Sequence, residues 1–238
     1  MANNETGHAT NIGNFKLMID ECTSFGPSYN PGNPALTTGN MTILWASGDS
    51  AHRNLTDAFQ LSKVPINHRQ ELFDSAEKIV TRTFNMFKSI ASGDRIKEDA
   101  KGLANRFRGY GVKVKKQADG TPDPDQVSTS HQGYIDRADT FRQLVTLIGS
   151  DANYTPNETD LKLPSLDALA TQMKNANDAI GTILAPVGAA RIARDNALYA
   201  PTTGMVDVAL SCKNYVKAVF GASSPQAKAV NGIKFSRK

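Results

Sequence analysis

The chain has 238 residues, of which 39% are hydrophobic, 21% are charged and only 7% are aromatic. A chain of this length buries a hydrophobic core without disulfides or a structural metal, and its composition is that of a globular protein. The net charge of +4 is too small to indicate nucleic-acid binding by itself, and the low aromatic content favours helices over sheets.

The two cysteines, Cys22 and Cys212, do not show the spacing of a disulfide framework or of a cysteine-based zinc site. We expect Cys212 to be a free, buried thiol. No apolar stretch reaches the ~18 residues of a membrane-spanning helix, and residues 1–14 lack the features of a secretory signal. The default expectation is a cytoplasmic protein, and export by a signal-independent route stays open.

Residues 1–41 are rich in Asn, Gly and Pro and contain one short apolar island at 15–19. Dipeptides such as Gly26-Pro27 and Asn30-Pro31 are typical of turns or extended backbone. We therefore predict an irregular N-terminal arm with at most one short strand or helical turn at 15–21. Such an arm becomes ordered only when it lies on another surface, so we expect it to contact neighbouring subunits.

A helical period begins at Thr42 and defines a first helical unit over 42–108. Small residues at Gly48, Ala51 and Ala58 form one helical stripe, which serves internal packing, an interface, or both. Pro65 is expected to end or kink this helix. An amphipathic helix then covers about 68–92, and Asp94 opens a shorter basic helix that runs to Phe107.

Residues 109–133 combine glycines, lysines and a proline-rich acidic stretch, and they are interpreted as a linker. The second helical unit, 134–238, starts with a helix at 134–148. A long helix follows from Ser165 and is bent near Pro186 before it ends at Tyr199. The last major helix is expected over 205–220.

The two units resemble each other in sequence, which indicates an internal repeat. Three positions of the first unit correspond to three of the second: Phe73, Asn85 and Lys88 to Tyr199, Asn214 and Lys217. We predict an all-α fold of two related helical hairpin units that form a four-helix-bundle-like core. Chance similarity between amphipathic helices is the alternative, and it predicts the same helices without the symmetry.

The C-terminal segment carries a further pattern in the order K-x-Y-V-x-x-x-F-G-x-x-S-P…V-x-G-I-K-F, between Lys213 and Phe235. This segment resembles the ending shared by a group of uncharacterised bacterial all-helical proteins. The resemblance covers roughly the last 45 residues, and it implies helices without implying an activity, a ligand or a catalytic residue.

Known catalytic motifs are missing from the sequence. His68 and Glu71 stand in the reverse order of the Glu-x-x-His pairs that di-iron bundles use. No glycine-rich phosphate loop, zinc-protease motif or nucleophile elbow occurs, and the acidic residues near Asp123 lack the remainder of a calcium loop. We therefore expect no enzymatic activity, no cofactor and no metal.

Basic residues alternate with aromatic ones in the segment 106–116. Its candidate contact residues are Arg106, Arg108, Tyr110, Lys113, Lys115 and Lys116. Such side chains neutralise phosphates and stack on bases, and they also suit an acidic patch on a neighbouring subunit. The leading hypothesis is a non-catalytic structural protein that self-associates into an oligomer or filament. The alternative is a nucleic-acid-binding helical protein that uses this segment.

Overall fold

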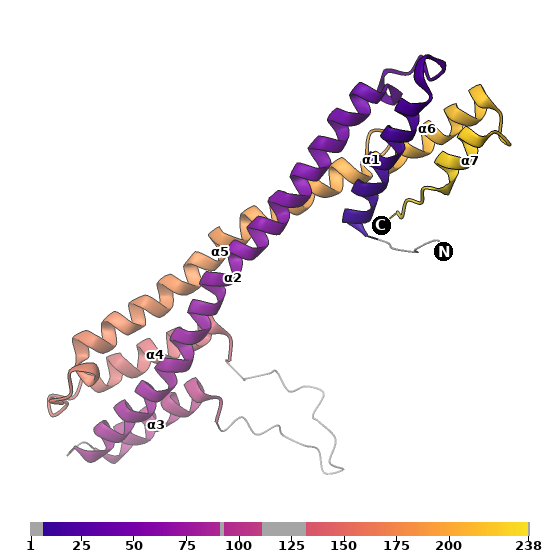
Figure 1. Cartoon of the computed structure of the whole chain (residues 1–238). Coiled ribbons are helices and arrows are strands. Elements are labelled where there is room, and N and C mark those ends of the chain that lie inside the picture. The colour runs from indigo at the N-terminus through magenta and orange to yellow at the C-terminus, as the bar shows by residue number, and fades with distance from the viewer. Residues whose placement is uncertain (1–6, 91–92, 111–131, 238) are drawn as a thin grey trace, which may run out of the picture. The chain divides into compact units, whose positions relative to one another are not determined.

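The computed structural model describes residues 7–90, 93–110 and 132–237, and the regular elements in these ranges are all helices. The prediction of an all-α fold is confirmed. The chain divides into two compact units (Figure 1). Unit 1 consists of residues 1–62 and 184–238, and unit 2 consists of residues 63–183. Two long helices, α2 (Thr38–Ser89) and α5 (Leu163–Tyr199), contribute residues to both units.

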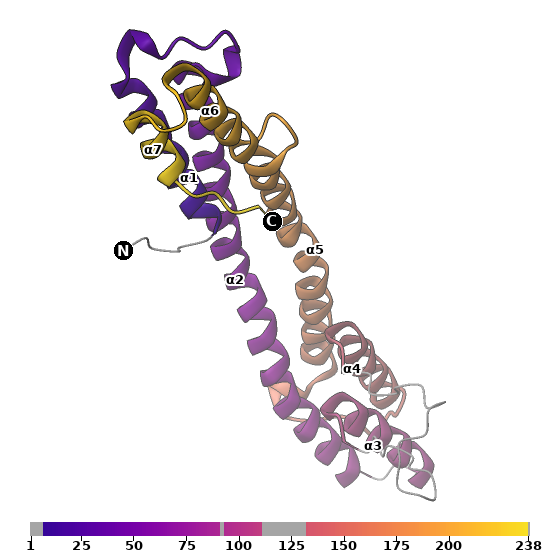
Figure 2. The same cartoon turned by 90° about the vertical axis from the view of Figure 1, so that its right-hand side faces the viewer.

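Unit 1 combines the two ends of the chain. Its elements are α1 (His8–Ser24), the 3-10 turns η1 (Gly26–Ser28) and η2 (Pro34–Leu36), the first part of α2, the last part of α5, α6 (Met205–Phe220) and α7 (Pro225–Gly232). Figure 2 shows α1, α6 and α7 beside one another. The largest fully buried side chains of this unit are Phe15, Met18, Met41 and Leu198.

The structure corrects the expectation of an irregular arm over 1–41, because residues 8–24 form the helix α1. Five apolar residues of α1 recur at helical spacing and lie in the core of unit 1: Ile12, Phe15, Met18, Ile19 and Cys22. Apart from Leu17, which is 48% exposed, the remaining residues of the helix are small or polar, and they hid this period in the sequence. Tertiary burial of one face stabilises such a helix despite its composition.

The turn signals that follow α1 are correct. Pro27 and Pro34 stand in the first turns of η1 and η2, where a missing backbone N–H costs nothing. The Asn33 side chain accepts a hydrogen bond from the Ala35 backbone N–H at 3.0 Å. Residues 26–36 therefore form an ordered connection that leads into α2.

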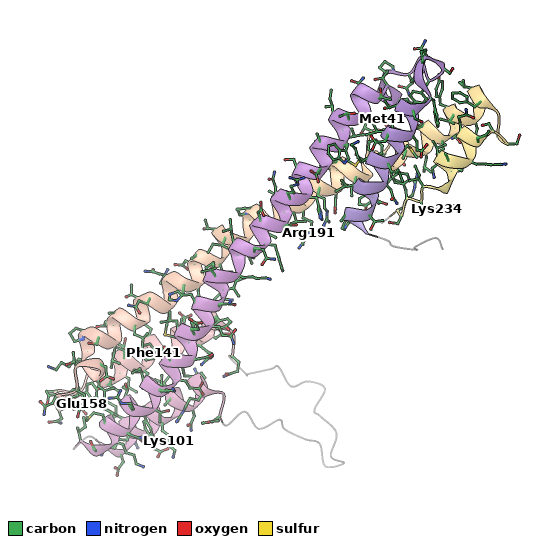
Figure 3. The ribbon with its side chains drawn as sticks, in the orientation of Figure 1. Met41, Lys101, Phe141, Glu158, Arg191 and Lys234 are labelled. Atoms are coloured by element: carbon green, nitrogen blue, oxygen red, sulfur yellow. The ribbon has the colours of Figure 1, made fainter. Side chains whose placement is uncertain are left out.

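Unit 2 is built from the middle of the chain. It contains the last part of α2, α3 (Asp94–Arg108), α4 (Tyr134–Gly149), the 3-10 turn η3 (Thr159–Leu161) and the first part of α5. Phe141, labelled in Figure 3, is fully buried on α4. The other large, fully buried side chains of this unit are Phe73, Phe87, Phe107, Leu144, Ile148, Leu166 and Met173.

The compact units differ from the predicted helical units 42–108 and 134–238. Pro65 was expected to end or kink its helix, and Pro186 to bend its helix; neither proline ends its helix, because both lie inside continuous helices. Each long helix therefore carries the chain from one compact unit into the other. As a result, each unit takes elements from both predicted halves of the chain. Most of the predicted linker 109–133, namely residues 111–131, lies outside the described residues.

The small-residue stripe on α2 has an internal packing role at Gly48. A Cβ atom at this position would lie 2.2 Å from Cε of Met205 and 3.5 Å from Cδ1 of Leu198. Glycine thus allows α2 to lie close against the residues that begin α6 and end α5 within unit 1. Ala51 and Ala58 are half-buried, so packing explains at least the glycine of the stripe.

The two units contain matching contacts. In unit 1, the Tyr29 hydroxyl donates to the Leu36 carbonyl oxygen, seven residues along the chain, at 2.7 Å. In unit 2, the Tyr154 hydroxyl donates to the Leu161 carbonyl oxygen, again seven residues along, at 2.9 Å. Both tyrosines stand in the connection that precedes a long helix. The same hydrogen bond therefore closes the α1–α2 and the α4–α5 connections.

A second matching contact joins aromatic rings edge to face. The rings of His8 and Tyr199 lie 5.6 Å apart in unit 1, and those of Tyr134 and Phe73 lie 4.9 Å apart in unit 2. In each pair, one ring stands at the start of a short helix and the other on a long helix. Phe73 and Tyr199, which the sequence comparison pairs, thus each contact a ring at the start of a short helix.

The buried faces also agree in spacing. Ala76, Val80, Thr83 and Phe87 on α2 have the same spacing as Met205, Ala209, Cys212 and Val216 on α6, and all eight are buried. In the same register, Asn85 and Asn214 are exposed, as are Lys88 and Lys217. The four polar residues chosen from the sequence therefore mark the solvent-facing side of both helices.

Candidate functional site

The basic segment is only partly described. Arg106 and Tyr110 are exposed and Arg108 is half-buried, whereas Lys113, Lys115 and Lys116 lie outside the described residues. The Arg108 guanidinium donates to the Asn105 side chain at 2.9 Å and to the Thr81 hydroxyl at 3.3 Å. It also lies 5.2 Å from the centre of the Tyr110 ring. Arg108 therefore holds α3 against α2 within unit 2, which leaves it less available for an external phosphate.

Grooves line both sides of α4 in unit 2. One groove of about 400 Å³ runs between α4 and α5, and a wider one of about 670 Å³ runs between α3 and α4 and includes Arg106. Arg142 borders both grooves. Its guanidinium is 2.8 Å from the Asp167 carboxylate.

The groove between α4 and α5 has a mixed lining. Ile135, Ala138 and Ala170 supply apolar surface, and Lys174 forms an ion pair with Asp178 along α5. Charges of both signs already paired with each other do not make a site for one charged ligand. Among residues 7–90, 93–110 and 132–237, no three His, Cys, Asp or Glu side chains are grouped so that they could hold a metal ion.

The most chemically distinctive cluster lies in the core of unit 1. The sulfur atoms of Cys22 on α1 and Cys212 on α6 are 3.4 Å apart. The Tyr29 hydroxyl lies 3.3 Å from the Cys212 sulfur and 3.8 Å from the Met41 sulfur. Cys22 is 1% exposed and Cys212 is fully buried. The cluster therefore combines two thiols, a thioether and a phenol without contact with bulk water.

The local contacts shift the pKa values of the two thiols in opposite directions. The hydrogen bond with Cys212 and burial raise the pKa of Cys22. The same hydrogen bond with Cys22 lowers the pKa of Cys212, burial partly opposes this shift, and the positive charge of Lys213 adds to it. Cys212 is thus the thiol that loses its proton first. Burial raises the pKa of Tyr29, which stays protonated.

A buried lysine lies next to this cluster. The ammonium group of Lys213 donates to the Ile233 carbonyl oxygen and lies 5.4 Å from the centre of the Phe235 ring. Burial lowers the pKa of Lys213, and the nearby Lys234 and Lys217 lower it further. Its role is to fix the segment after α7 against α6, since its donor ends on a backbone carbonyl.

An exposed apolar face lies on the part of α5 that belongs to unit 1. Residues 183–190 contain no charged side chain. Leu184 is 42% exposed and Ile192 is 63% exposed, and the small residues Ala185 and Gly188 between them are exposed as well. These four residues recur at helical spacing, so they share one side of the helix. We call them the α5 face.

Arg191, which is labelled in Figure 3, directly precedes Ile192 of the α5 face in the sequence. Val187, in the same helical turn as Leu184, is buried at 6% exposure, so the α5 face begins beside a buried position. The sequence showed the apolar run but not its exposure, because an apolar helix segment usually faces a core. Contiguous apolar surface left in water is a common mark of an interaction site.

Comparison with known proteins adds no relative: no protein-family model matches the chain, and no significant match was found among curated proteins or solved structures. Among the helices in the described ranges, none is both long and apolar enough to cross a membrane.

Proposed function

We propose that this protein is a non-catalytic structural protein that self-associates into an oligomer or filament. The observation that carries the proposal is the α5 face, where Leu184 and Ile192 expose apolar surface at the two ends of a stretch whose residues 183–190 carry no charge. Covering such a face with a second copy removes apolar area from water at roughly 25 cal/mol per Å². The small residues Ala185 and Gly188 allow a partner helix to approach closely.

The proposed contact surface differs from the one expected from the sequence. Residues 8–36 of the predicted arm supply core side chains such as Phe15 and Leu36 to unit 1. Side chains that fill their own core are not free to lie on a neighbour. The proposal therefore assigns the contact between copies to the α5 face instead.

The matched contacts of the two units support the interpretation that the chain contains an internal duplication. In this interpretation, α1, the Tyr29 connection and α2 correspond to α4, the Tyr154 connection and α5. Because each unit then combines parts of both copies, the two copies complete each other's cores within one chain. A duplicated, interlaced scaffold without a metal-ligand cluster in its described part suits a structural role.

The test is light scattering combined with size-exclusion chromatography over a range of protein concentrations. We expect the unaltered protein to form assemblies and the double variant Leu184→Lys/Ile192→Glu to lose them while keeping its helical circular dichroism. The matched control is Ile135→Glu, which changes an equally prominent side chain, 68% exposed, on α4 of unit 2. A monomeric unaltered protein, or assemblies that the double variant leaves intact, would refute the proposal.

A further inference from the structure

We infer that Cys22 and Cys212 are a reversible dithiol–disulfide pair that, on oxidation by a peroxide, covalently joins α1 to α6 within unit 1. The two sulfurs are 3.4 Å apart although the residues are separated by 190 positions in the chain. They need to approach only to the ~2.05 Å of a disulfide bond. These are also the two cysteines of the whole sequence.

The hydrogen bond of Tyr29 has a counterpart in unit 2 that involves no sulfur. Tyr154 donates to a carbonyl oxygen seven residues ahead, as Tyr29 does, and the side chain that interacts with its hydroxyl is that of Thr83. Such a tyrosine can therefore stand beside a hydroxyl side chain, so its hydrogen bond does not by itself require a thiol.

The surroundings give the two thiols different roles. Cys212 lies between two polar hydrogen-bond partners, the Cys22 sulfur at 3.4 Å and the Tyr29 hydroxyl at 3.3 Å, and the hydrogen bond with Cys22 lowers its pKa; it is the nucleophile that attacks the oxidant. Cys22, whose pKa is raised, is the resolving thiol. A nucleophilic cysteine beside a resolving cysteine is the arrangement that leads to a disulfide rather than to irreversible overoxidation.

The reaction balances with hydrogen peroxide as the oxidant. The Cys212 thiolate attacks one peroxide oxygen and the O–O bond breaks; the departing hydroxide takes up the proton that the Cys212 thiol lost, giving water and a Cys212 sulfenic acid. The Cys22 sulfur then attacks the Cys212 sulfur, and the sulfenic hydroxide leaves as a second water with the Cys22 proton. Two thiols are oxidised, one peroxide is reduced to two waters, and a dithiol reductant reverses the change.

Burial sets which reagents reach the pair. Cys22 and Cys212 are at most 1% exposed, so a bulky thiol reagent reacts only when α1 separates locally from α6. Hydrogen peroxide is much smaller and needs a smaller opening. The disulfide would then tie the N-terminal helix to the C-terminal helices of unit 1, because α1 contacts both α6 and α7.

The experiment treats the reduced full-length protein with graded hydrogen peroxide, alkylates remaining thiols after denaturation, and determines intact mass and linked peptides. We expect a product lighter by two hydrogens, a Cys22–Cys212 linked peptide, a monomer band on a non-reducing gel, and a raised thermal unfolding midpoint. A dithiol should reverse all of these. Two alkylatable thiols after treatment, sulfinic acid at either cysteine, or a linked dimer as the main product would overturn the inference.

The variants Cys22→Ser and Cys212→Ser separate the two roles. In Cys22→Ser, peroxide should leave a Cys212 sulfenic acid that a dimedone probe labels, whereas the unaltered protein should show little labelling. In Cys212→Ser, labelling of Cys22 should be much weaker. Equal labelling of the two variants would contradict the assigned nucleophile. Because the pair lies within unit 1, these results do not depend on whether the protein self-associates.

Discussion

At the residue scale, two buried tyrosines repeat the same hydrogen bond. Tyr29 and Tyr154 each donate to a carbonyl oxygen seven residues ahead, and both rings are less than one tenth exposed. Replacing either tyrosine with phenylalanine leaves a buried carbonyl without its donor, which costs about 1–3 kcal/mol. We expect denaturant unfolding to show losses of this size for Tyr29→Phe and Tyr154→Phe. Tyr110→Phe, on an exposed ring, is the control and should change stability by less than about 0.5 kcal/mol.

Tyr154 also makes the stability of the folded protein depend on pH. Burial is the main cause that raises the pKa of Tyr154 from 10.0 to about 12, and an interaction with Thr83 partly offsets it. Since the folded state holds this proton more tightly than the unfolded state, the stabilisation is complete below pH 10 and is lost as the pH rises to 12. Tyr154→Phe should therefore lose less stability across this window than the unaltered protein. Equal losses in the two proteins would show that Tyr154 does not titrate as described.

At the scale of helices, the correspondence between the two units can be tested by transplanting the thiol pair. In the proposed duplication, Cys22 corresponds to Ile148 on α4 and Cys212 corresponds to Thr83 on α2, and all four side chains are buried. In a Cys22→Ser/Cys212→Ser background, Thr83→Cys combined with Ile148→Cys should form an intrachain disulfide on oxidation. The mass of the oxidised protein and a peptide map measure this. A control with Ile148→Cys and Asn85→Cys, which places the second thiol on the exposed side of α2, should not form the link.

Individual helices differ in how well their sequences predict them. The amphipathic pattern around Phe73, Val80 and Phe87 is strong enough to identify the second half of α2. The helix α1 was missed because Asn and Gly surround its apolar residues, although Ile12, Phe15 and Cys22 have the correct spacing. Local propensity disfavoured this helix, and burial against α6 and α7 outweighed the propensity.

At the scale of the whole molecule, the two compact units do not follow each other along the chain. Unit 2 is the continuous segment 63–183, whereas unit 1 needs both 1–62 and 184–238. We expect the fragment 63–183 to fold by itself and to unfold cooperatively on heating. The fragments 1–108 and 134–238, which follow the sequence repeat, should each be largely unfolded because each holds half of two cores.

Circular dichroism and thermal unfolding of the three fragments measure this difference. Mixing 1–108 with 134–238 should restore the helical signal, since together they supply the helices of both units. Cooperative folding of 1–108 alone would mean that the two halves do not depend on each other. The stability of the full-length protein would then not depend on cores that are shared between the two halves of the chain.

The sequence by itself determined the helical class and the positions of most helices. It did so because helical periodicity is a local property, which a window of one or two turns contains. It also suggested the relation between Phe73 and Tyr199, since related segments keep similar residues at related positions.

Only the tertiary structure decided which helices share a core, because that depends on contacts between residues far apart in the chain. It placed Cys22 against Cys212 across 190 residues and carried α2 and α5 through their prolines into both units. It also showed that the apolar stretch around Leu184 and Ile192 faces water. Periodicity says that a helix has an apolar face, but only the packing of the other helices determines whether that face is covered.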